Sequence, residues 1–229
     1  MKEKIYLWGD SIGQGVIYDP ERRRYRLSHS RCEKLLRERG VSLECRARMG
    51  ATVGDGYADF AATEVTEPGL AVIEFGGNDC DLDWQAVSDR PDVFHDGKTP
   101  LPEFQAMLEL FARRAGDRGL EPVLVLPPPI CPERYFDWVC RGRSRESVRA
   151  YLGDVGHIGR WHSCYVEAIR RAARVTNARI LDLNTPFMQA MDYPALMGAD
   201  GIHPSEAGQE LIARVSLRAL ADRAEKRAG

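Results

Sequence analysis

The sequence has no long apolar run and no large excess of charge of either sign. A membrane-spanning helix needs about 20 consecutive apolar residues, so we expect no membrane span. The formal net charge of -2 over 229 residues gives no electrostatic reason to expect nucleic acid or an acidic membrane as a partner. The first residues are charged, and the apolar run after them is too short for the core of a signal peptide. We therefore expect a cytoplasmic protein.

Metal-binding patterns are also missing. The six cysteines include no Cys-x-x-Cys pair, and no histidine stands at zinc-ligand spacing beside them. His157 and His162 lie five residues apart on one predicted helix, a spacing that places them poorly on a shared face. We therefore expect reduced, structural cysteines and no metal or other cofactor.

Linkers, internal repeats and low-complexity stretches are absent from the sequence as well. With 44% hydrophobic residues, the chain can bury a sizeable core. We expect a single domain over residues 1–229. Two stretches, at about 77–100 and 127–156, show no clear periodicity and are expected to be irregular insertions. Loops of such length in a compact domain are usually functional.

Apolar runs alternate with helical periodicity along the whole chain. Strands are predicted at residues 5–8, 41–45, 70–75, 123–126 and 180–183. Helices are predicted at about residues 28–39, 53–65, 101–119 and 158–172, and from residue 204 onward. This alternation predicts an α/β fold, a three-layer α/β/α sandwich around a five-stranded parallel sheet. The third strand is apolar nearly throughout, so we expect it to be central.

Polar residues follow the predicted strands where a site would form. Ser11 comes directly after the first strand, Gly50 after the second and Asn78 after the third, while Asp200 and His203 follow the fifth. Because loops at the carboxyl ends of parallel strands lie at one edge of the sheet, we expect these residues to converge. A serine hydroxyl becomes a good nucleophile when a base and oxyanion donors lie beside it. The pattern therefore indicates a serine hydrolase.

Four motifs, in this order along the chain, resemble those of the SGNH, or GDSL, hydrolases. They are Gly9-Asp10-Ser11-Ile12, Gly50, Gly76-Gly77-Asn78-Asp79 and Asp200-Gly201-Ile202-His203. Ile12 stands where leucine is usual, which is a conservative departure. Asp10 and Asp79 adjoin the motif residues, and we expect them to brace their turns by accepting backbone hydrogen bonds.

The resemblance implies a flavodoxin-like SGNH hydrolase fold and an esterase or lipase with a serine nucleophile. Ser11 would attack the ester carbonyl, His203 would act as general base, and Asp200 would orient the imidazole. The resemblance also assigns an oxyanion hole to the backbone N–H groups of Ser11 and Gly50 and to the side-chain amide of Asn78.

Substrate specificity is expected to reside in two arginine-rich segments near the predicted site. Arg24, Arg141, Tyr135 and Trp138 are our candidate substrate-binding residues, since arginines bind anionic groups and aromatic rings provide stacking surfaces. The alternative, which we favour for the arginines, is a solvated charged surface.

The expected function is hydrolysis of a small soluble carboxylic ester through an acyl-enzyme. The resemblance suggests short acyl groups, including acetyl esters of carbohydrates. A lysophospholipase or thioesterase-type acyl hydrolase is the nearest alternative.

Two alternatives come from other classes. The ligand types of Asp10, Asn78, Asp79 and His203 would suit a metal-dependent phosphoesterase, and Asp10 could be the phosphoacceptor of a non-catalytic flavodoxin-like binding module. The oligomeric state stays open.

Overall fold

The structure, a computed structural model, describes residues 4–38 and 41–228 and is built around a parallel β-sheet. The strands are β1 (Lys4–Gly9), β4 (Ser42–Cys45), β5 (Gly69–Glu74), β6 (Leu120–Leu126) and β7 (Arg179–Asp182). They pair in the order β4-β1-β5-β6-β7, all parallel. The predicted five-stranded parallel sheet is confirmed, with β5 at its centre. Numbered along the chain, the order is 2-1-3-4-5, which is the flavodoxin-like order.

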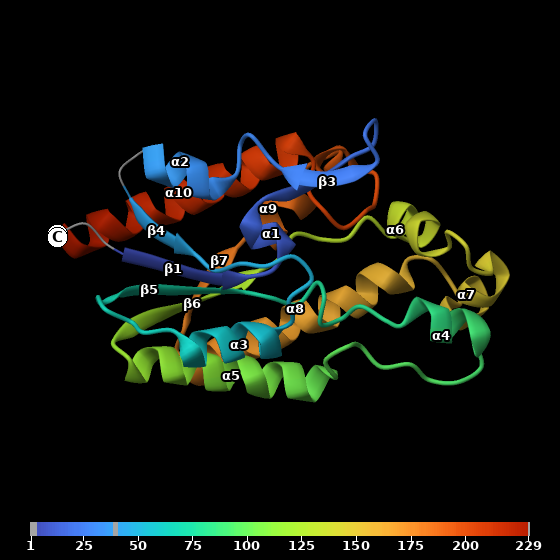
Figure 1. Ribbon diagram of the computed structural model, residues 1–229, viewed down its shortest axis with the longest axis horizontal. Coiled ribbons are helices and arrows are strands. Elements are labelled where there is room, and N and C mark those ends of the chain that lie inside the picture. Colours follow the sequence, from blue (N-terminus) through green and yellow to red (C-terminus); the bar gives the residue numbers. More distant parts are fainter. Residues whose placement is uncertain (1–3, 39–40, 229) are drawn as a thin grey trace.

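Helices cover both faces of this sheet (Figure 1). One layer consists of α3 (Val53–Ala62), α5 (Leu101–Asp117) and α8 (His157–Thr176). The other contains α2 (Cys32–Glu38), α9 (Asn184–Met188), the 3-10 helix η1 (Tyr193–Leu196) and α10 (Glu206–Ala228). The three-layer sandwich is therefore confirmed. The last residue of the helix predicted at residues 28–39 lies outside the described residues.

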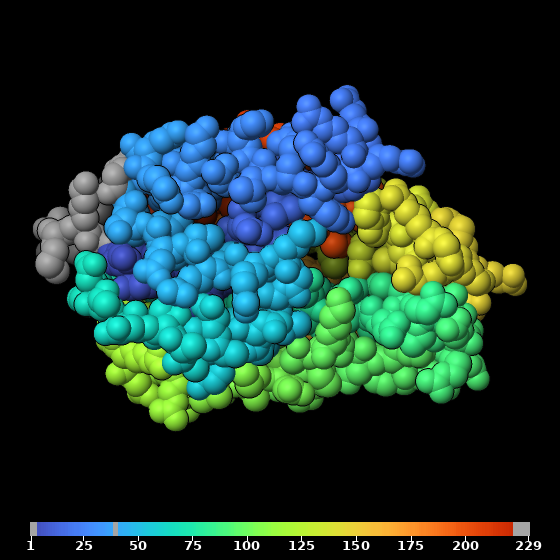
Figure 2. Space-filling model, in the orientation of Figure 1, coloured from blue at the N-terminus to red at the C-terminus, as the bar shows by residue number. Residues whose placement is uncertain are grey.

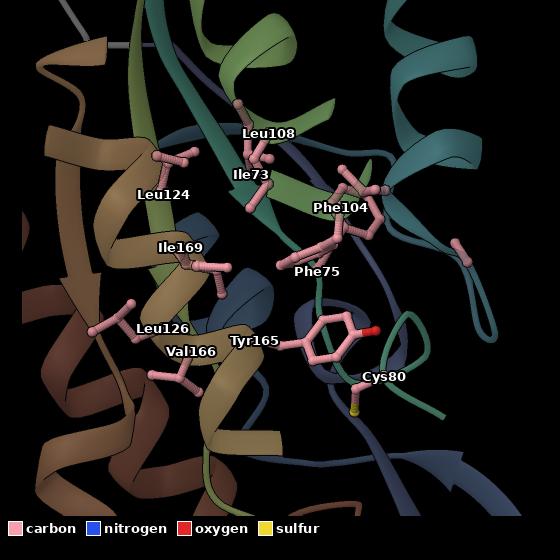
Figure 3. Packing of buried hydrophobic residues seen from close by; sticks show 14 of the residues in the cluster. Ile73, Phe75, Cys80, Phe104, Leu108, Leu124, Leu126, Tyr165, Val166 and Ile169 are labelled. Atoms are coloured by element: carbon pink, nitrogen blue, oxygen red, sulfur yellow. The ribbon is translucent and has the colours of Figure 1, made fainter. Parts of the chain in front are cut away.

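The larger hydrophobic core lies between the sheet and the layer of α3, α5 and α8. On α5, Phe104, Leu108 and Phe111 recur three and four residues apart, so they share one face of the helix, and all are buried. In Figure 3, Ile73 of β5 lies near Phe104 and Leu108, and Ile169 of α8 lies on the other side of this group. Each such side chain contributes about 1.5–3 kcal/mol through its burial, so this face holds the helices on the sheet.

The segments 77–100 and 127–156, which we expected to be irregular, contain short helices. They are α4 (Trp84–Asp89), α6 (Pro132–Val139) and α7 (Arg145–Leu152). With six to eight residues each, these helices are too short for a repeated apolar spacing to appear in the sequence. Local signals start them instead, because Asp83 and Ser144 accept hydrogen bonds from first-turn N–H groups and Pro132 opens α6. All three helices lie beyond the carboxyl ends of the strands (Figure 1).

A small β-hairpin has no counterpart among the predicted elements. After the single-turn helix α1 (Ser11–Gln14), β2 (Val16–Asp19) pairs antiparallel with β3 (Arg24–Leu27). Each strand has only four residues, and Arg23 rather than a glycine adopts the left-handed φ of 51° in the turn. The usual hairpin signal is therefore missing from the sequence.

Gly56 on α3 provides a test of how closely this core is packed. An added Cβ there would lie 2.1 Å from Cζ of Phe75, a buried ring that has no room to move aside. We expect Gly56→Ala to lower the free energy of unfolding by about 1–3 kcal/mol, although alanine favours helix more than glycine does. Urea denaturation measures this change.

Gly54→Ala, on the same helix, is the matched control. The nearest atom to a Cβ at this position is Oγ1 of Thr52 at 3.7 Å, so the methyl group fits. We expect this variant to be unchanged or up to about 1 kcal/mol more stable. Equal effects of the two substitutions would contradict the close packing of Phe75 against α3.

Candidate active site

Ser11 is held at the first position of α1, where the chain leaves β1. The side chain of Asp10 caps this turn by accepting the Ile12 N–H at 2.8 Å. Gly15 ends it in the left-handed conformation, with a φ of 80°. The Ser11 side chain is therefore fixed at the carboxyl end of β1, next to the point where the strand order reverses. Open α/β sheets form ligand sites at such switch points.

Three side chains stand in a row at this point. Nε2 of His203 lies 2.9 Å from Oγ of Ser11, and Nδ1 of the same ring lies 2.7 Å from Oδ2 of Asp200. The other oxygen of Asp200 accepts the backbone N–H groups of Ile202 and His203, so the turn holds the carboxylate in place. Because a carboxylate only accepts, the ring proton belongs on Nδ1, and Nε2 is left to accept from the Ser11 hydroxyl.

The ring of Tyr25 packs against the imidazole of His203. Its ring centroid lies 4.9 Å from that of His203, and it comes from β3 of the unpredicted hairpin. Burial and then the negative charge of Asp200 raise the pKa of Tyr25 well above its usual value, so the phenol stays neutral. The spacing of motifs gave no signal for this residue, because the hairpin that carries it was not recognised.

Asn78 reaches from the loop after β5 to the loops after β1 and β4. Its Nδ2 donates to Oδ2 of Asp10 at 3.0 Å and to the carbonyl oxygen of Ala51 at 3.2 Å. The Asn78 amide therefore lies beside the turn that carries Ser11.

Gly50 lies in the loop that the Asn78 amide contacts. This loop is attached on both sides of Gly50, since the Arg48 N–H donates to Gly9 and the Ala51 carbonyl accepts from Asn78. Gly50 itself has a φ of 79°, which favours glycine, and is exposed. The structure thus brings Gly50 and Asn78 to the turn that carries Ser11.

The expectation that Asp10 and Asp79 brace their turns is confirmed. Asp10 caps α1, as described above. Asp79 accepts the N–H of Gly76 at 3.1 Å, the N–H of Val53 at 3.0 Å and the hydroxyl of Thr99 at 2.7 Å. It therefore ties the loop after β5 to the start of α3. Burial raises the pKa of Asp79 to about 6, in spite of these donors.

Glu74 is a buried carboxyl group that motif comparison did not find. Its Oε2 accepts the N–H groups of Asp10 at 3.2 Å and Gly13 at 3.0 Å, so it supports the turn from behind. A Cβ on Gly9 would lie 2.8 Å from this oxygen, which explains the glycine at that position. The signal that could have revealed Glu74 is an acidic residue inside an otherwise apolar strand.

The environment of Glu74 favours its neutral form. Its second oxygen, Oε1, is buried and accepts no hydrogen bond from any described residue. Burial and then the charge of Asp10 raise the pKa of Glu74 well above its usual value. Glu74 therefore holds its proton to higher pH than a free glutamic acid does, while its Oε2 accepts the two backbone hydrogen bonds.

A pocket opens from this row toward the three insertion helices. It encloses about 930 Å3 of non-atom space, open mouth included. Ser11, Asn78 and His203 lie at one end, and the wall includes Leu82, Trp84, Ile130, Tyr135, Tyr151, Leu152, Ile158, Trp161 and His162. Figure 2 shows a hollow where segments coloured blue, cyan and yellow meet, with orange atoms from the region near residue 200 at its base. The wall is mostly apolar and aromatic, as in small-molecule sites.

The four candidate substrate-binding residues are placed differently. Tyr135 lines the pocket, whereas Arg24, Trp138 and Arg141 are not among its lining residues. Trp138 packs edge-on against Tyr18 of the hairpin, and the Arg141 guanidinium lies 3.9 Å from the Trp138 ring centroid. Arg24 is exposed on β3. A contact of these three residues with substrate stays a prediction.

Neither a membrane-spanning helix nor a metal cluster is found among the described residues. Within residues 4–38 and 41–228, no helix is both long enough and apolar enough to cross a membrane. Over the same part of the chain, no group of three or more His, Cys, Asp or Glu side chains is arranged to hold a metal ion.

The strand order and the polar cluster at its switch point define the class of SGNH-type α/β hydrolases. The sequence model of the GDSL-like Lipase/Acylhydrolase family matches residues 7–211, and the chain belongs to this family. Its members are acyl hydrolases, generally serine esterases and lipases. No curated protein matches the chain significantly.

Solved structures show the same fold. A lipase/acylhydrolase from Enterococcus faecalis is 21% identical with a TM-score of 0.65, and the match covers 96% of each chain. The psychrotrophic esterase EstA from Pseudoalteromonas sp. is 18% identical with a TM-score of 0.63, over 98% of this chain and 100% of that one. A member of the lipolytic G-D-S-L family from Veillonella parvula is 17% identical with a TM-score of 0.64, over 94% and 97%.

The raised pKa of Glu74 generates a prediction about stability and pH. A carboxyl group with a raised pKa in the folded state stabilises the fold at low pH, and this contribution is lost as pH rises above its unfolded pKa of about 4.3. Glu74→Gln keeps a neutral side chain whose oxygen can accept both N–H groups at every pH. Relative to the wild type, its free energy of unfolding should therefore increase between pH 5 and 8, by at most about 1.4 kcal/mol per pH unit.

Urea denaturation at pH 5, 6.5 and 8 measures this difference. Glu74→Leu is the control, since it is also neutral but leaves the N–H groups of Asp10 and Gly13 without their acceptor. We expect it to be less stable than Glu74→Gln at all three values. A difference between Glu74→Gln and wild type that does not change with pH would show that Glu74 is ionised in the folded protein.

Proposed function

We propose that this protein is a serine esterase that hydrolyses a small carboxylic ester, with Ser11 as nucleophile, His203 as general base and Asp200 as the group that orients the imidazole. The observation that carries the proposal is the continuous row from Ser11 Oγ through the ring of His203 to Asp200, with separations of 2.9 and 2.7 Å. All three side chains are buried, which strengthens their electrostatic interactions relative to water.

The reaction proceeds in two steps. The oxygen of Ser11 attacks the ester carbonyl while its proton moves to Nε2 of His203. The tetrahedral intermediate then expels the alcohol, which takes this proton and leaves an acyl-enzyme. A water molecule repeats the sequence on the acyl-enzyme, with His203 again as base, and releases the acid. Asp200 stays ionised and stabilises the imidazolium in both steps.

The negative charge that develops on the carbonyl oxygen is stabilised by an oxyanion hole. Its donors are the backbone N–H of Ser11 in the first turn of α1, the backbone N–H of Gly50 and the Nδ2 of Asn78. Two features support this assignment, namely the attachment of both loops to the Ser11 turn and the position of the Asn78 amide beside that turn. Both N–H groups of Nδ2 have partners in Asp10 and Ala51, so one of them turns from its partner to the oxyanion when substrate binds. The two backbone N–H groups are preorganised and need no rearrangement during the reaction.

The substrate proposal is a small ester with a short acyl group, such as an acetyl ester, and the pocket then holds the alcohol part. The aromatic rings of Trp84 and Tyr135 support this, since they offer flat surfaces to a sugar or an aromatic group. An acyl hydrolase of the lysophospholipase or thioesterase type is the second candidate. It is supported by the apolar walls of the same pocket, which would then hold the acyl chain.

Two alternative functions involve no serine nucleophile and would use the acidic residues differently. In a metal-dependent phosphoesterase, Asp10 and Asp79 would be ligands, and in a binding module Asp10 would accept a phosphoryl group. The serine mechanism is favoured because both carboxylates are already engaged by backbone and side-chain donors and because Ser11 is aligned with His203.

Replacing the nucleophile tests the proposal. Ser11→Ala should lower kcat/KM for p-nitrophenyl acetate, butyrate and octanoate at least about a thousandfold, because no group remains to form the acyl-enzyme. A chelator should leave wild-type activity unchanged. In the wild type, a rate that falls with acyl length supports the short-acyl esterase, and one that rises supports the acyl-chain alternative.

Ser163→Ala is the matched control, since Ser163 is an exposed serine on α8 and should keep full activity. Full ester hydrolysis by Ser11→Ala would overturn the proposal. Phosphoester cleavage that a chelator abolishes, without any ester cleavage, would favour the metal-dependent class.

Replacing the side-chain oxyanion donor gives a separate prediction. Asn78→Ala should lower kcat about a hundredfold to a thousandfold with little change in KM, because the donor acts on charge that develops only in the transition state. Steady-state kinetics with p-nitrophenyl acetate measure both constants. A loss confined to KM would mean that Asn78 binds the ground state and lies outside the oxyanion hole.

A further inference from the structure

The aromatic wall of the pocket has its polar atoms occupied by the protein itself. Nε1 of Trp84 and the hydroxyl of Tyr135 both donate to Oδ1 of Asp81, at 2.8 and 2.5 Å. Nε1 of Trp161 donates to the Cys80 carbonyl at 2.8 Å. These rings therefore present apolar surfaces to whatever enters the pocket.

Tyr151 and His95, which also line the pocket, likewise have partners within the protein. The hydroxyl of Tyr151 donates to the His95 carbonyl at 3.0 Å, and Nε2 of His95 lies 2.8 Å from the Arg90 carbonyl oxygen. The pocket is thus lined in large part by aromatic rings whose N–H and O–H donors are already used. Such a lining does not discriminate between substrates by hydrogen bonds.

His162 is the buried exception on this wall, and the half-buried His157 is a second lining imidazole whose ring forms no hydrogen bond with a described residue. His162 lies on α8, lines the pocket and is only 3% exposed. Among the described residues, none forms a hydrogen bond with its ring, although every other buried polar side chain on the pocket wall has a partner. A buried polar group without a partner destabilises a protein, so most such groups are paired.

The ring of His162 is also neutral under ordinary conditions. Burial lowers its pKa to about 4, and no described acidic side chain contacts it. A neutral imidazole has one N–H donor and one nitrogen acceptor. It can therefore pair with a hydroxyl, an amide or a carbonyl group, and it has no charge with which to attract a carboxylate or a phosphate.

We propose that His162 is a specificity-determining residue that hydrogen-bonds a neutral polar group on the part of the ester that fills the pocket. This inference rests on the proposed function, since the ester must reach Ser11 at one end of the same pocket. The substrate class is an ester whose pocket-filling group is aromatic or similarly flat and carries a hydroxyl or an equivalent neutral group away from the scissile bond. Purely apolar esters then react more slowly.

Matched pairs of esters test this assignment. For an alcohol group in the pocket, the pair is 2-phenylethyl acetate and its 3- or 4-hydroxyphenyl analogue. For an acyl group in the pocket, it is p-nitrophenyl 3-phenylpropanoate and the corresponding 3- or 4-hydroxyphenyl ester. In the wild type, kcat/KM should be about tenfold higher for at least one hydroxylated ester than for its parent. In His162→Phe this ratio should fall to about one, with the rate on the parent ester kept or increased.

Two further measurements separate recognition from structure. The melting temperature of His162→Phe should equal or exceed that of the wild type, because the substitution removes an unpartnered polar group from the interior. His162→Asn retains a donor and an acceptor and should keep part of the preference. His29→Phe, an exposed histidine outside the pocket, should leave both the ratio and the rate unchanged.

The outcomes distinguish this inference from the function on which it rests. A ratio that is the same in wild type and His162→Phe, or a wild type that prefers no hydroxylated ester, overturns the role of His162 while hydrolysis still depends on Ser11. A lower melting temperature of His162→Phe with an unchanged ratio shows that the residue is structural, and also overturns it. Hydrolysis that survives Ser11→Ala overturns the proposed function itself.

Discussion

Buried carboxyl groups that accept backbone N–H groups hold the loops at the carboxyl edge of the sheet. Glu74 accepts a hydrogen bond from the turn that carries Ser11, and Asp10 caps that turn. Asp79 connects the loop after β5 to the start of α3. Asn78 connects the same loops through its amide. A parallel sheet positions only the strand ends, so these bonds determine where the side chains beyond the ends are located. The hydrogen bond between Ser11 and His203 depends on these loops, because it forms only when the two side chains are held within reach of each other.

The three insertion helices and the hairpin have a different relation to the sheet. They lie beyond the strand ends, where they surround the pocket and cover the imidazole of His203. The central sheet and its helices position Ser11 and His203, while the insertions form much of the wall of the pocket beside them. Functional loops on a rigid scaffold commonly divide the work in this way. On the pocket wall a carboxyl group again holds its neighbours in place, since Asp81 accepts hydrogen bonds from Trp84 and Tyr135.

Much of the fold followed from local patterns. The five strands and the long helices α5 and α8 have apolar spacings repeated over enough residues to be recognised. The short helices and the hairpin do not, because two turns of helix or four residues of strand leave no repeated period. Glu74 and His162 were missed as site residues for another reason. Glu74 is an acidic residue at the end of an apolar strand and His162 lies on the buried face of α8, and the surroundings of both come from distant parts of the chain.

The sequence by itself determined the alternation of strands and helices, the family resemblance and the identity of the residues at the strand ends. These depend on residue order and periodicity, which are local properties. Only the tertiary structure decided the distance between Ser11 and His203, which lie 192 positions apart, the raised pKa of Glu74 and the wall of the pocket. Each of these depends on burial and on contacts between segments far apart in the chain. Neither burial nor such contacts can be read from any one stretch of residues.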